Sequence, residues 1–511
     1  ALVLAGAWAS SAVAAAPTLE PEFVVSPTGS SPEVAISANG DFAVGWVVRA
    51  AYARVYSARG DSRGPAFLLS EDANQFAAWL QIASNDRGQF VAVWAANVAE
   101  GQGSARLRVL ARRFDRFGNL QGPPFVVSST IELPPGAQEQ MPVVDMDDRG
   151  GFVVVWSPDP ASVVARRFDR NGAPLGSNFQ VHAEGDARLA RVAMQRDGSF
   201  LVCWSTNLGG QLAAGARARA FLRNGEPLSG DIVLNSAEGQ QGCTDASRSG
   251  GGGYTVIWTG RMGAERGIFA REVDGNGNLA GDPVRVVPFE PVEELPPVFA
   301  SGGSTAAASS GRFLIVWEGL DPIQLEDSNW AIRARHFSPD LWPLSPPLQV
   351  NEPVPSGLSQ PAAACATSGA CIVVWQWEWD PNQDALPEIR ARKLKPALPL
   401  EVSAEGARRR ILEVALQLFA RHGFHGASVR DLTQALELQP SQLYVHFDSK
   451  EALLAELVEV GHRALLSALQ AALEGVGSDP RARLRAIVGA HAAVHARFPQ
   501  LAVVVNEEMD A

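Results

Sequence analysis

A short motif that ends in tryptophan recurs seven times in the first four hundred residues of this chain. Each copy begins with a glycine turn and continues with alternating apolar positions, as in Gly151-Phe152-Val153-Val154-Val155-Trp156. Alternation with a period of two is typical of a half-buried β-strand. The tryptophans lie 48 to 62 residues apart, at Trp46, Trp94, Trp156, Trp204, Trp258, Trp317 and Trp375. A strand repeat of this length predicts a β-propeller, in which each unit buries its faces against its neighbours.

Each repeat has room for four short strands, and counting the outermost strand predicts how the ring closes. We expect outer strands at Phe23–Val25, Phe67–Leu69, Phe125–Val127, Phe179–Val181, Ile232–Leu234, Val284–Val286 and Leu348–Val350. The first of these precedes the first tryptophan strand, so the seventh repeat has no outer strand of its own. Phe23–Val25 is predicted to pair beside Ile389–Arg392, which would latch the ring and hide a strand edge. Leu398–Val402 is the alternative for the same position. The prediction is a seven-bladed all-β propeller over residues 20–395.

The propeller repeats show no constellation of catalytic residues, so we predict that the chain is not an enzyme and needs no cofactor. The tryptophans occupy matched positions and are expected in the core. The recurring arginine of Ala165-Arg166-Arg167 and Ala334-Arg335 alternates with apolar residues, which favours a solvated strand face. Asp274-Gly275-Asn276-Gly277-Asn278 is interpreted as a hairpin turn because it lacks the glutamate of a calcium loop. Fold alone leaves the ligand of the propeller, protein or glycan, undetermined.

The cysteines and the N-terminus bear on the cellular compartment. None of Cys203, Cys243, Cys365 and Cys371 has metal-ligand spacing, and no metal site is predicted. Cys365 and Cys371 flank a tight turn, where a hairpin disulfide and two buried thiols are both compatible with the sequence. Residues 1–17 are small and apolar and end like a signal-peptidase site, so we expect a segment that begins inside a signal peptide. An Ala-rich disordered terminus is the alternative. No stretch is long enough to span a bilayer.

The composition changes near Lys395, where Pro and Gly become rarer and Ala, Leu and Glu more frequent. Residues 396–403 are predicted to be a linker. Apolar residues from Ile411 to Phe419 then follow a helical period, and Gly423 is expected as the left-handed cap that ends this helix. Ser428 with Asp431 forms an approximate capping box for a second, short helix. Pro440 opens a third helix, and Ser449 caps a long fourth one. Two short helices that follow a longer one across a tight turn describe a helix-turn-helix.

Three stretches give this region a specific resemblance over roughly 50 residues. They are Ile411-Leu412-x-x-Ala415-x-x-Leu418-Phe419-x-x-x-Gly423-Phe424, Ala427-Ser428-Val429-Arg430-Asp431-Leu432 and Leu443-Tyr444-x-His446-Phe447-x-Ser449-Lys450-Glu451-x-Leu453. Residues 404–454 resemble the DNA-binding domain of the tetracycline-repressor (TetR) family of bacterial transcription regulators. The expected fold is therefore multidomain, with the all-β propeller followed by an all-α domain of TetR type. Double-stranded DNA is the partner that the resemblance implies.

The resemblance also implies roles for individual residues. Arg408, Arg409 and Arg410 would face phosphates, and Thr433 would flank the groove. Pro440, Ser441 and Gln442 would point at base edges, with Gln442 as the reader of adenine. Tyr444 would donate to a phosphate, with a core position as the alternative, and Lys450 would lie at the DNA backbone. Phe447 is expected in the core.

The chain also departs from the family pattern. Glu437 and Gln439 replace the usual Gly and small cap of the turn, and Glu437 adds a negative charge near DNA. Residues 455–511 are expected to be a truncated part of the helical domain that binds inducers and dimerises in the family. A homodimer is therefore predicted only where further C-terminal helices are present. His491 and His495 lack the Glu of a zinc-protease motif and are expected on a helix surface.

Two interpretations of the whole chain remain open. In the first, the chain is a transcription regulator whose propeller is a sensory or interaction module, and it acts in the cytoplasm. In the second, it is a secreted or surface propeller that binds protein or glycan and has been fused, recently or artefactually, to a regulator fragment. A functional signal peptide would favour the second location, because export removes the helix-turn-helix from DNA.

Overall fold

The computed structural model describes the chain as two compact units that divide between Pro396 and Ala397. The described residues are 18–99, 105–127, 131–132, 142–159, 162–182, 186–207, 214–235, 242–249, 252–262, 265–288, 304–307, 313–320, 330–337, 341, 347–352, 357–378, 387–395, 404–436, 443–444, 446–447, 449–473, 479–497 and 503–504. The expected signal peptide (residues 1–17) and the expected linker after Lys395 (residues 396–403) lie outside them.

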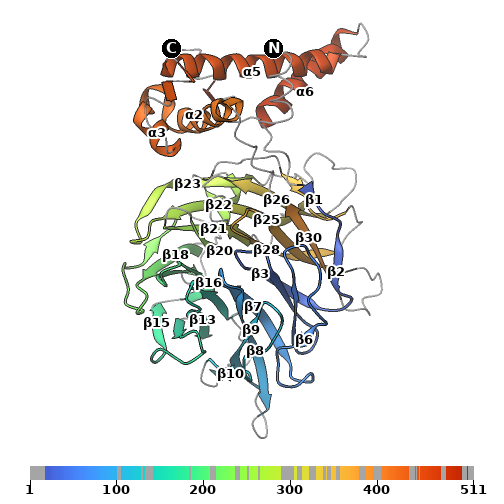
Figure 1. The fold of residues 1–511 in the computed structure, drawn as a ribbon, viewed down its shortest axis with the longest axis vertical. Helices are drawn as coiled ribbons and strands as arrows, with labels where there is room; N and C mark the ends of the chain where they lie inside the picture. Colours follow the sequence, from blue (N-terminus) through green and yellow to red (C-terminus); the bar gives the residue numbers. More distant parts are fainter. Residues whose placement is uncertain are drawn as a thin grey trace. The chain divides into compact units, whose positions relative to one another are not determined.

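The first unit is a seven-bladed β-propeller whose blades are antiparallel sheets of four or five strands (Figure 1). Blades 1 to 3 contain β3 (Ser30–Ile36), β4 (Phe42–Val47), β5 (Ala51–Tyr56), β6 (Phe67–Leu68), β7 (Ala77–Ser84), β8 (Gln89–Ala99), β9 (Ala105–Asp115), β10 (Phe125–Val126), β11 (Ile131–Glu132), β12 (Val143–Met146), β13 (Phe152–Asp159), β14 (Ser162–Phe168) and β15 (Phe179–His182). Blades 4 and 5 contain β16 (Asp186–Met194), β17 (Phe200–Asn207), β18 (Ala214–Phe221), β19 (Ile232–Val233), β20 (Gly242–Arg248), β21 (Tyr254–Met262), β22 (Glu265–Val273) and β23 (Leu279–Pro288). Blade 6 contains β24 (Ser304–Ala307), β25 (Phe313–Leu320), β26 (Trp330–Phe337) and β27 (Leu348–Gln349). The predicted blade count is confirmed.

Blade 7 is built from both ends of the propeller sequence. Its strands are β28 (Leu358–Cys365), β29 (Cys371–Trp377), β30 (Glu388–Lys395) and the N-terminal β2 (Phe23–Ser26) and β1 (Thr18–Leu19). Phe23 pairs with Ala391 and Val24 with Arg390, so the predicted closure is confirmed. The sequence did not suggest the extra pairing of β1 with residues 394–395.

The repeat tryptophans form the core between blades, as predicted. Trp94, Trp204, Trp258 and Trp375 are fully buried. Each core cluster draws on neighbouring blades, as where Trp46 packs in one cluster with Val374 and Ile389 across the closure. Burying an indole removes roughly 150–250 Å² from water, so each matched position contributes several kcal/mol before entropy is counted.

The recurring arginine of the third strand corrects one sequence interpretation. Its guanidinium is not simply solvated, because it donates to a carbonyl at the outer strand of the preceding blade. Arg166 Nη1 lies 3.0 Å from Val127 O, and Arg271 Nη1 lies 3.0 Å from Leu234 O. The same bond recurs from Arg54 to Val25, from Arg112 to Leu69, and from Arg392 to Val350. These arginines therefore tie adjacent blades together.

The hairpin turns and disulfides complete the propeller. Asp274 begins a five-residue turn in which its Oδ1 accepts from the backbone N–H groups of Asn276 and Asn278, and Gly277 takes a φ of 86°. The interpretation of this segment as a hairpin turn is supported. Disulfides join Cys365 to Cys371 across one hairpin, and Cys203 of blade 4 to Cys243 of blade 5. The second bond was not anticipated.

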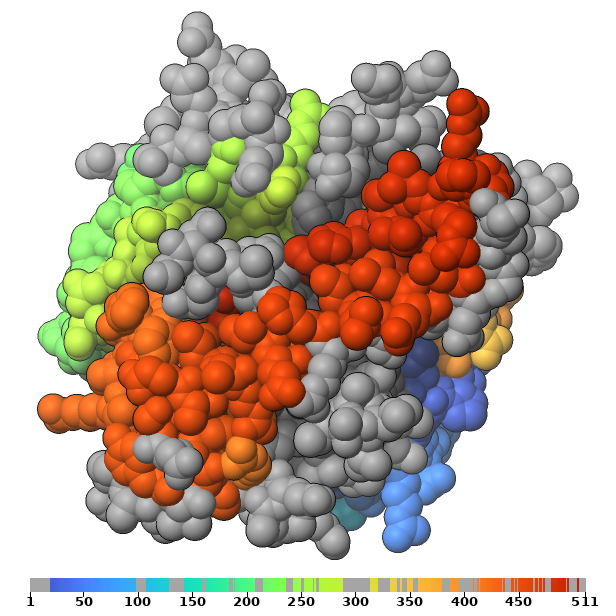
Figure 2. Space-filling model, turned by 90° about the horizontal axis from the view of Figure 1, so that it is seen from above, coloured from blue at the N-terminus to red at the C-terminus, as the bar shows by residue number. Residues whose placement is uncertain are grey.

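The second unit is helical, and its described surface forms the orange and red atoms of Figure 2. Its helices are α2 (Ala404–Gly426), α3 (Val429–Leu436), α5 (Lys450–Leu473) and α6 (Pro480–Arg497). One buried cluster unites Phe419 of α2, Leu432 of α3, Leu443 and Phe447 of the segment between α3 and α5, and Leu457 of α5. Within the described residues, no helix is long and apolar enough to cross a membrane.

Candidate DNA-binding helices

The junction between α2 and α3 is set by one glycine. Gly423 has φ 69° and ψ 163°, which interrupts α2 three residues before its end. Glycine adopts a positive φ without the steric cost that a Cβ would add. The chain therefore turns at the predicted position, and Phe424 folds back on Phe419 with a ring-centroid distance of 5.3 Å.

The start of α3 has the predicted capping box. Ser428 Oγ accepts from the Asp431 N–H at 3.1 Å, and Asp431 Oδ2 accepts from the Ser428 N–H at 2.8 Å. The hydrogen bonds from Ser428 lower the pKa of the Asp431 carboxyl. These reciprocal bonds satisfy N–H groups that a helix N-terminus leaves without partners. They fix where α3 begins relative to the turn.

Arg408 lies in α2, where its guanidinium contacts other parts of the same unit. It forms an ion pair with Glu456 of α5 and donates to the carbonyl of His446. Its Cζ lies 4.1 Å from the ring centroid of Phe447, which is a cation–π distance. The predicted phosphate contact of Arg408 stays a prediction, and the structure adds that Glu456 already balances this charge.

Lys450 also has internal partners. Its Nζ donates to the carbonyls of Phe424 at 2.7 Å and Ala427 at 2.8 Å, and it lies 4.1 Å from the Phe424 ring centroid. An ammonium group has three N–H donors, so these bonds leave one for another acceptor. Lys450 therefore holds the turn between α2 and α3, whether or not it also reaches DNA.

The other predicted site residues differ in solvent exposure, and some lie outside the described residues. Tyr444 is 48% exposed, which leaves it accessible to an outside acceptor, whereas Thr433 is buried and donates to the Arg430 carbonyl at 3.0 Å. Arg409 and Arg410 belong to α2, but their side chains lie outside the described residues. Pro440, Ser441 and Gln442 also lie outside them.

The exposed guanidinium of Arg430 in the first turn of α3 was missed by the sequence reasoning. The helical period contained the signal, because the buried Leu432 and Leu436 place Arg430 on another face of α3.

Comparison with known proteins identifies this segment. Residues 411–457 match the family model described as bacterial regulatory proteins, tetR family. The HTH-type transcriptional regulator UidR of Escherichia coli (strain K12) is 32% identical over 77 residues, which are 15% of this chain and 39% of UidR. The HTH-type transcriptional repressor KstR2 of Rhodococcus jostii (strain RHA1) is 33% identical over 103 residues, 20% of this chain and 50% of KstR2. The chain thus spans half or less of the length of these curated relatives.

Solved structures match each unit separately. The TetR family transcriptional regulator PfmR from Thermus thermophilus is 37% identical, with 20% of this chain and 54% of PfmR covered and a TM-score of 0.19. A protein of unknown function from Dyadobacter fermentans DSM 18053 is 11% identical, with 64% of this chain and 97% of that chain covered and a TM-score of 0.41. Residues 411–457 thus match the tetR family, and they follow a seven-bladed β-propeller in the sequence.

Proposed function

We propose that the chain is a TetR-like transcription regulator in which residues 404–454 bind double-stranded DNA and the propeller is a sensory or interaction module. The match of residues 411–457 to the tetR family carries the proposal. The buried cluster that unites α2, α3, the Leu443–Phe447 segment and α5 supports it, because a helix-turn-helix needs a rigid core to present its third helix.

The proposed interface divides base reading from phosphate binding. Pro440, Ser441 and Gln442 open the third helix and face base edges, where the amide of Gln442 pairs with adenine. Tyr444 donates to a phosphate, and Arg430 supplies a cation on the exposed face of α3. Phosphate contacts of this kind position the protein without reading sequence.

We propose a homodimer as the active species where further C-terminal helices are present. Apolar side chains stay exposed on the last two described helices, with exposed fractions of 57% for Leu466 of α5 and 62% and 58% for Leu484 and Val488 of α6. Exposed apolar residues on two helices that contact each other are typical of an interaction surface. A dimer would place two recognition helices about 34 Å apart, one turn of DNA.

A second candidate function follows from the disulfides. Cys203–Cys243 and Cys365–Cys371 both lie in the propeller, and disulfides persist mainly in oxidising compartments. This observation favours a secreted or surface propeller that binds protein or glycan. Labelling of free thiols in protein isolated from its native host separates the two, because a cytoplasmic regulator would keep these thiols reduced.

The test is a salt-titrated DNA-binding assay on the full chain, with a selected operator duplex and a scrambled duplex. Gln442→Ala should reduce the preference for the operator by about 1–3 kcal/mol at one base position. Arg430→Gln should weaken both duplexes alike and reduce the salt slope by about one unit. Gln180→Ala, at an exposed glutamine of the propeller strand β15, is the matched control and should change neither quantity. If wild-type protein showed no preference for any selected duplex, the regulator proposal would fail.

A further inference from the structure

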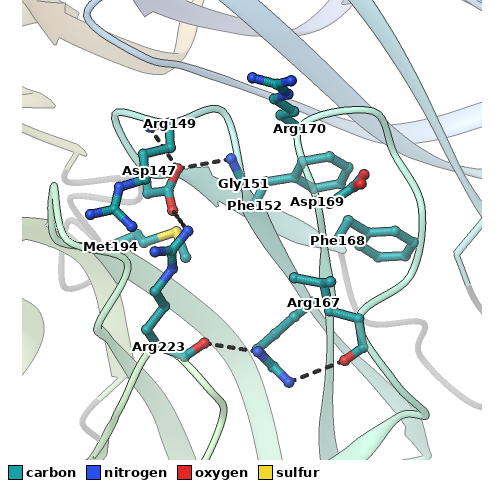
Figure 3. Close-up of a pocket in the computed structure, with 11 residues that line it drawn as sticks. Asp147, Arg149, Gly151, Phe152, Arg167, Phe168, Asp169, Arg170, Met194 and Arg223 are labelled. Carbon is teal, nitrogen blue, oxygen red and sulfur yellow. Dashed lines mark hydrogen bonds and ion pairs between the residues drawn. The ribbon is translucent and has the colours of Figure 1, made fainter.

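A pocket of about 320 Å³ lies where blade 3 meets blade 4 of the propeller (Figure 3). Four arginines and two aspartates line it, together with Phe152, Phe168, Leu175 and Met194. Its volume is within the range of small-molecule sites, which combine apolar walls with a few polar groups.

The two aspartates are committed to the local turns. Asp147 Oδ1 accepts from the N–H groups of Arg149 and Gly151 at 2.9 and 2.8 Å. Asp169 Oδ1 accepts from the N–H groups of Asn171 and Ala173, both at 2.8 Å. Asp147 also lies 3.5 Å from the guanidinium of Arg223. With four guanidinium groups against two carboxylates, the pocket has an excess of positive charge in a chain whose net charge is −12.

Arg167 is a lining cation whose guanidinium is bonded to backbone carbonyls. Its guanidinium donates to the Arg223 carbonyl at 2.8 Å and to the Leu175 carbonyl at 3.1 Å, as Figure 3 shows. Within the described residues it forms no ion pair with a carboxylate. Burial, and then the like charge of Arg223, lower the pKa of Arg167.

The equivalent cations at two other blade junctions do have acidic neighbours. Arg113 of blade 2 donates to the Arg170 carbonyl at 2.7 Å, and the nearby Asp169 opposes the lowering of its pKa by burial. Lys393 of blade 7 donates to the Ala58 carbonyl at 2.7 Å and lies 3.5 Å from Glu20. At those two junctions a nearby carboxylate therefore compensates the positive charge of the cation that joins the blades.

A single residue difference explains the contrast. The turn after the third strand begins with Asp115 in blade 2, Asp169 in blade 3 and Asp274 in blade 5, but with Leu222 in blade 4. Asp169 of blade 3 lies near Arg113 of blade 2, and Leu222 is the equivalent residue of blade 4 for Arg167 of blade 3. The acid is missing at the junction that holds the pocket.

We propose that this pocket binds a small organic anion, whose carboxylate or phosphate group faces Arg167 and whose apolar body lies against Leu175, Met194 and the two phenylalanines. The bound anion supplies the negative charge that Leu222 does not. Hydrogen bonds to charged groups are the stronger class, so the anionic group dominates affinity. This inference deepens the proposed sensory role of the propeller by naming a ligand class.

Isothermal titration calorimetry on the full chain tests the proposal, with phenyl phosphate and benzoate as anionic probes and benzyl alcohol as the neutral one. The wild type should bind at least one anionic probe and not benzyl alcohol. Leu222→Asp installs the missing carboxylate and should weaken anion binding roughly tenfold or more, because an internal acid then competes for Arg167. Arg167→Gln should cause a similar loss by removing the cation.

Ser57→Asp is the matched control, because it adds the same charge at the equivalent position in blade 1, beside the already neutralised Lys393. It should leave the affinity within about twofold of wild type. Absence of binding by both anionic probes, equal binding by the Leu222→Asp and Ser57→Asp variants, or unchanged binding by Arg167→Gln would each overturn the proposal. The operator-binding assay is scored separately, so failure of the anion site and failure of the regulator proposal give different results.

Discussion

Arginine in the third strand of a blade has two tasks that depend on its length. Its stem passes alongside the apolar positions of the strand, while its guanidinium reaches the preceding blade, as with Arg166 and Val127. A charged donor on a carbonyl is worth about 1.5–3 kcal/mol, and partial exposure lowers that figure. Repeated around a ring, such bonds join blades whose strands belong to separate sheets.

The first prediction concerns this bond. Arg166→Met keeps most of the side-chain volume but loses the bond to the Val127 carbonyl, so the propeller should lose about 1–2 kcal/mol of stability. Arg87→Met removes an exposed arginine from a turn of blade 2 and should change stability by less than about 0.5 kcal/mol. Urea unfolding followed by tryptophan fluorescence measures both. Equal effects of the two substitutions would show that the bond of Arg166 does not stabilise the propeller, as expected for a solvated strand face.

Single residues were predictable where the cause is local in sequence. The roles of Gly423, Ser428 and Asp431 follow from neighbours three or four positions away, and the structure has them as expected. Arg166 was misjudged because its acceptor lies 39 residues earlier, on another blade. The same limit concealed the partners of Arg408 and Lys450, which depend on how the helices pack.

Among the strands, the N-terminal β2 is the one that closes the ring. It pairs with β30 through Phe23 and Val24, and its Val25 is 1% exposed in a cluster shared by blades 7 and 1. Val24 on the same strand is 48% exposed. A pleated strand turns successive side chains to opposite faces, so neighbouring positions separate core packing from strand pairing.

The second prediction uses that alternation. Val25→Asp places a carboxylate in the closure core and should cost about 3 kcal/mol or more, because a buried charge without a partner is strongly disfavoured. Val24→Asp adds the same group to the solvent side and should cost less than about 1 kcal/mol. Limited proteolysis at the N-terminus and thermal unfolding report ring opening. Similar stability of both variants would mean that β2 does not hold the ring closed.

Elements were the most predictable level because the motif repeats. Counting seven tryptophan strands against seven outer strands was enough to predict the N-terminal closure. The strand count could not predict β1, which has only two residues. It also could not predict the Cys203–Cys243 disulfide, whose partners lie 40 residues apart on different blades. Such a bond follows from how blades are stacked, which a strand pattern does not encode.

The whole molecule combines two units with separate hydrophobic cores. The helical core cluster consists of residues between Ile411 and Val504, and the propeller clusters consist of residues between Leu19 and Leu394. We propose that residues 20–395 and the residues from 404 onward are separate domains joined by a linker at 396–403. Separate cores imply separate cooperative transitions, because each domain loses its own buried area when it unfolds.

The third prediction is that the two domains unfold independently, and the sequence supplies clean probes for it. Twelve of the 13 tryptophans lie between Trp46 and Trp379 and none follows residue 404, so tryptophan fluorescence is dominated by the propeller. Circular dichroism at the helical minimum is dominated by the C-terminal helices. Leu432→Ala removes a fully buried side chain and should destabilise the helical domain by about 2–5 kcal/mol. Leu432→Ala should leave the fluorescence transition of the propeller unchanged. Arg166→Met should shift the fluorescence transition and leave the circular dichroism transition of the helices unchanged. A shift of both transitions by either substitution would show that the domains are energetically coupled, and the propeller would then have a direct route for passing a bound ligand's free energy to the DNA-binding helices.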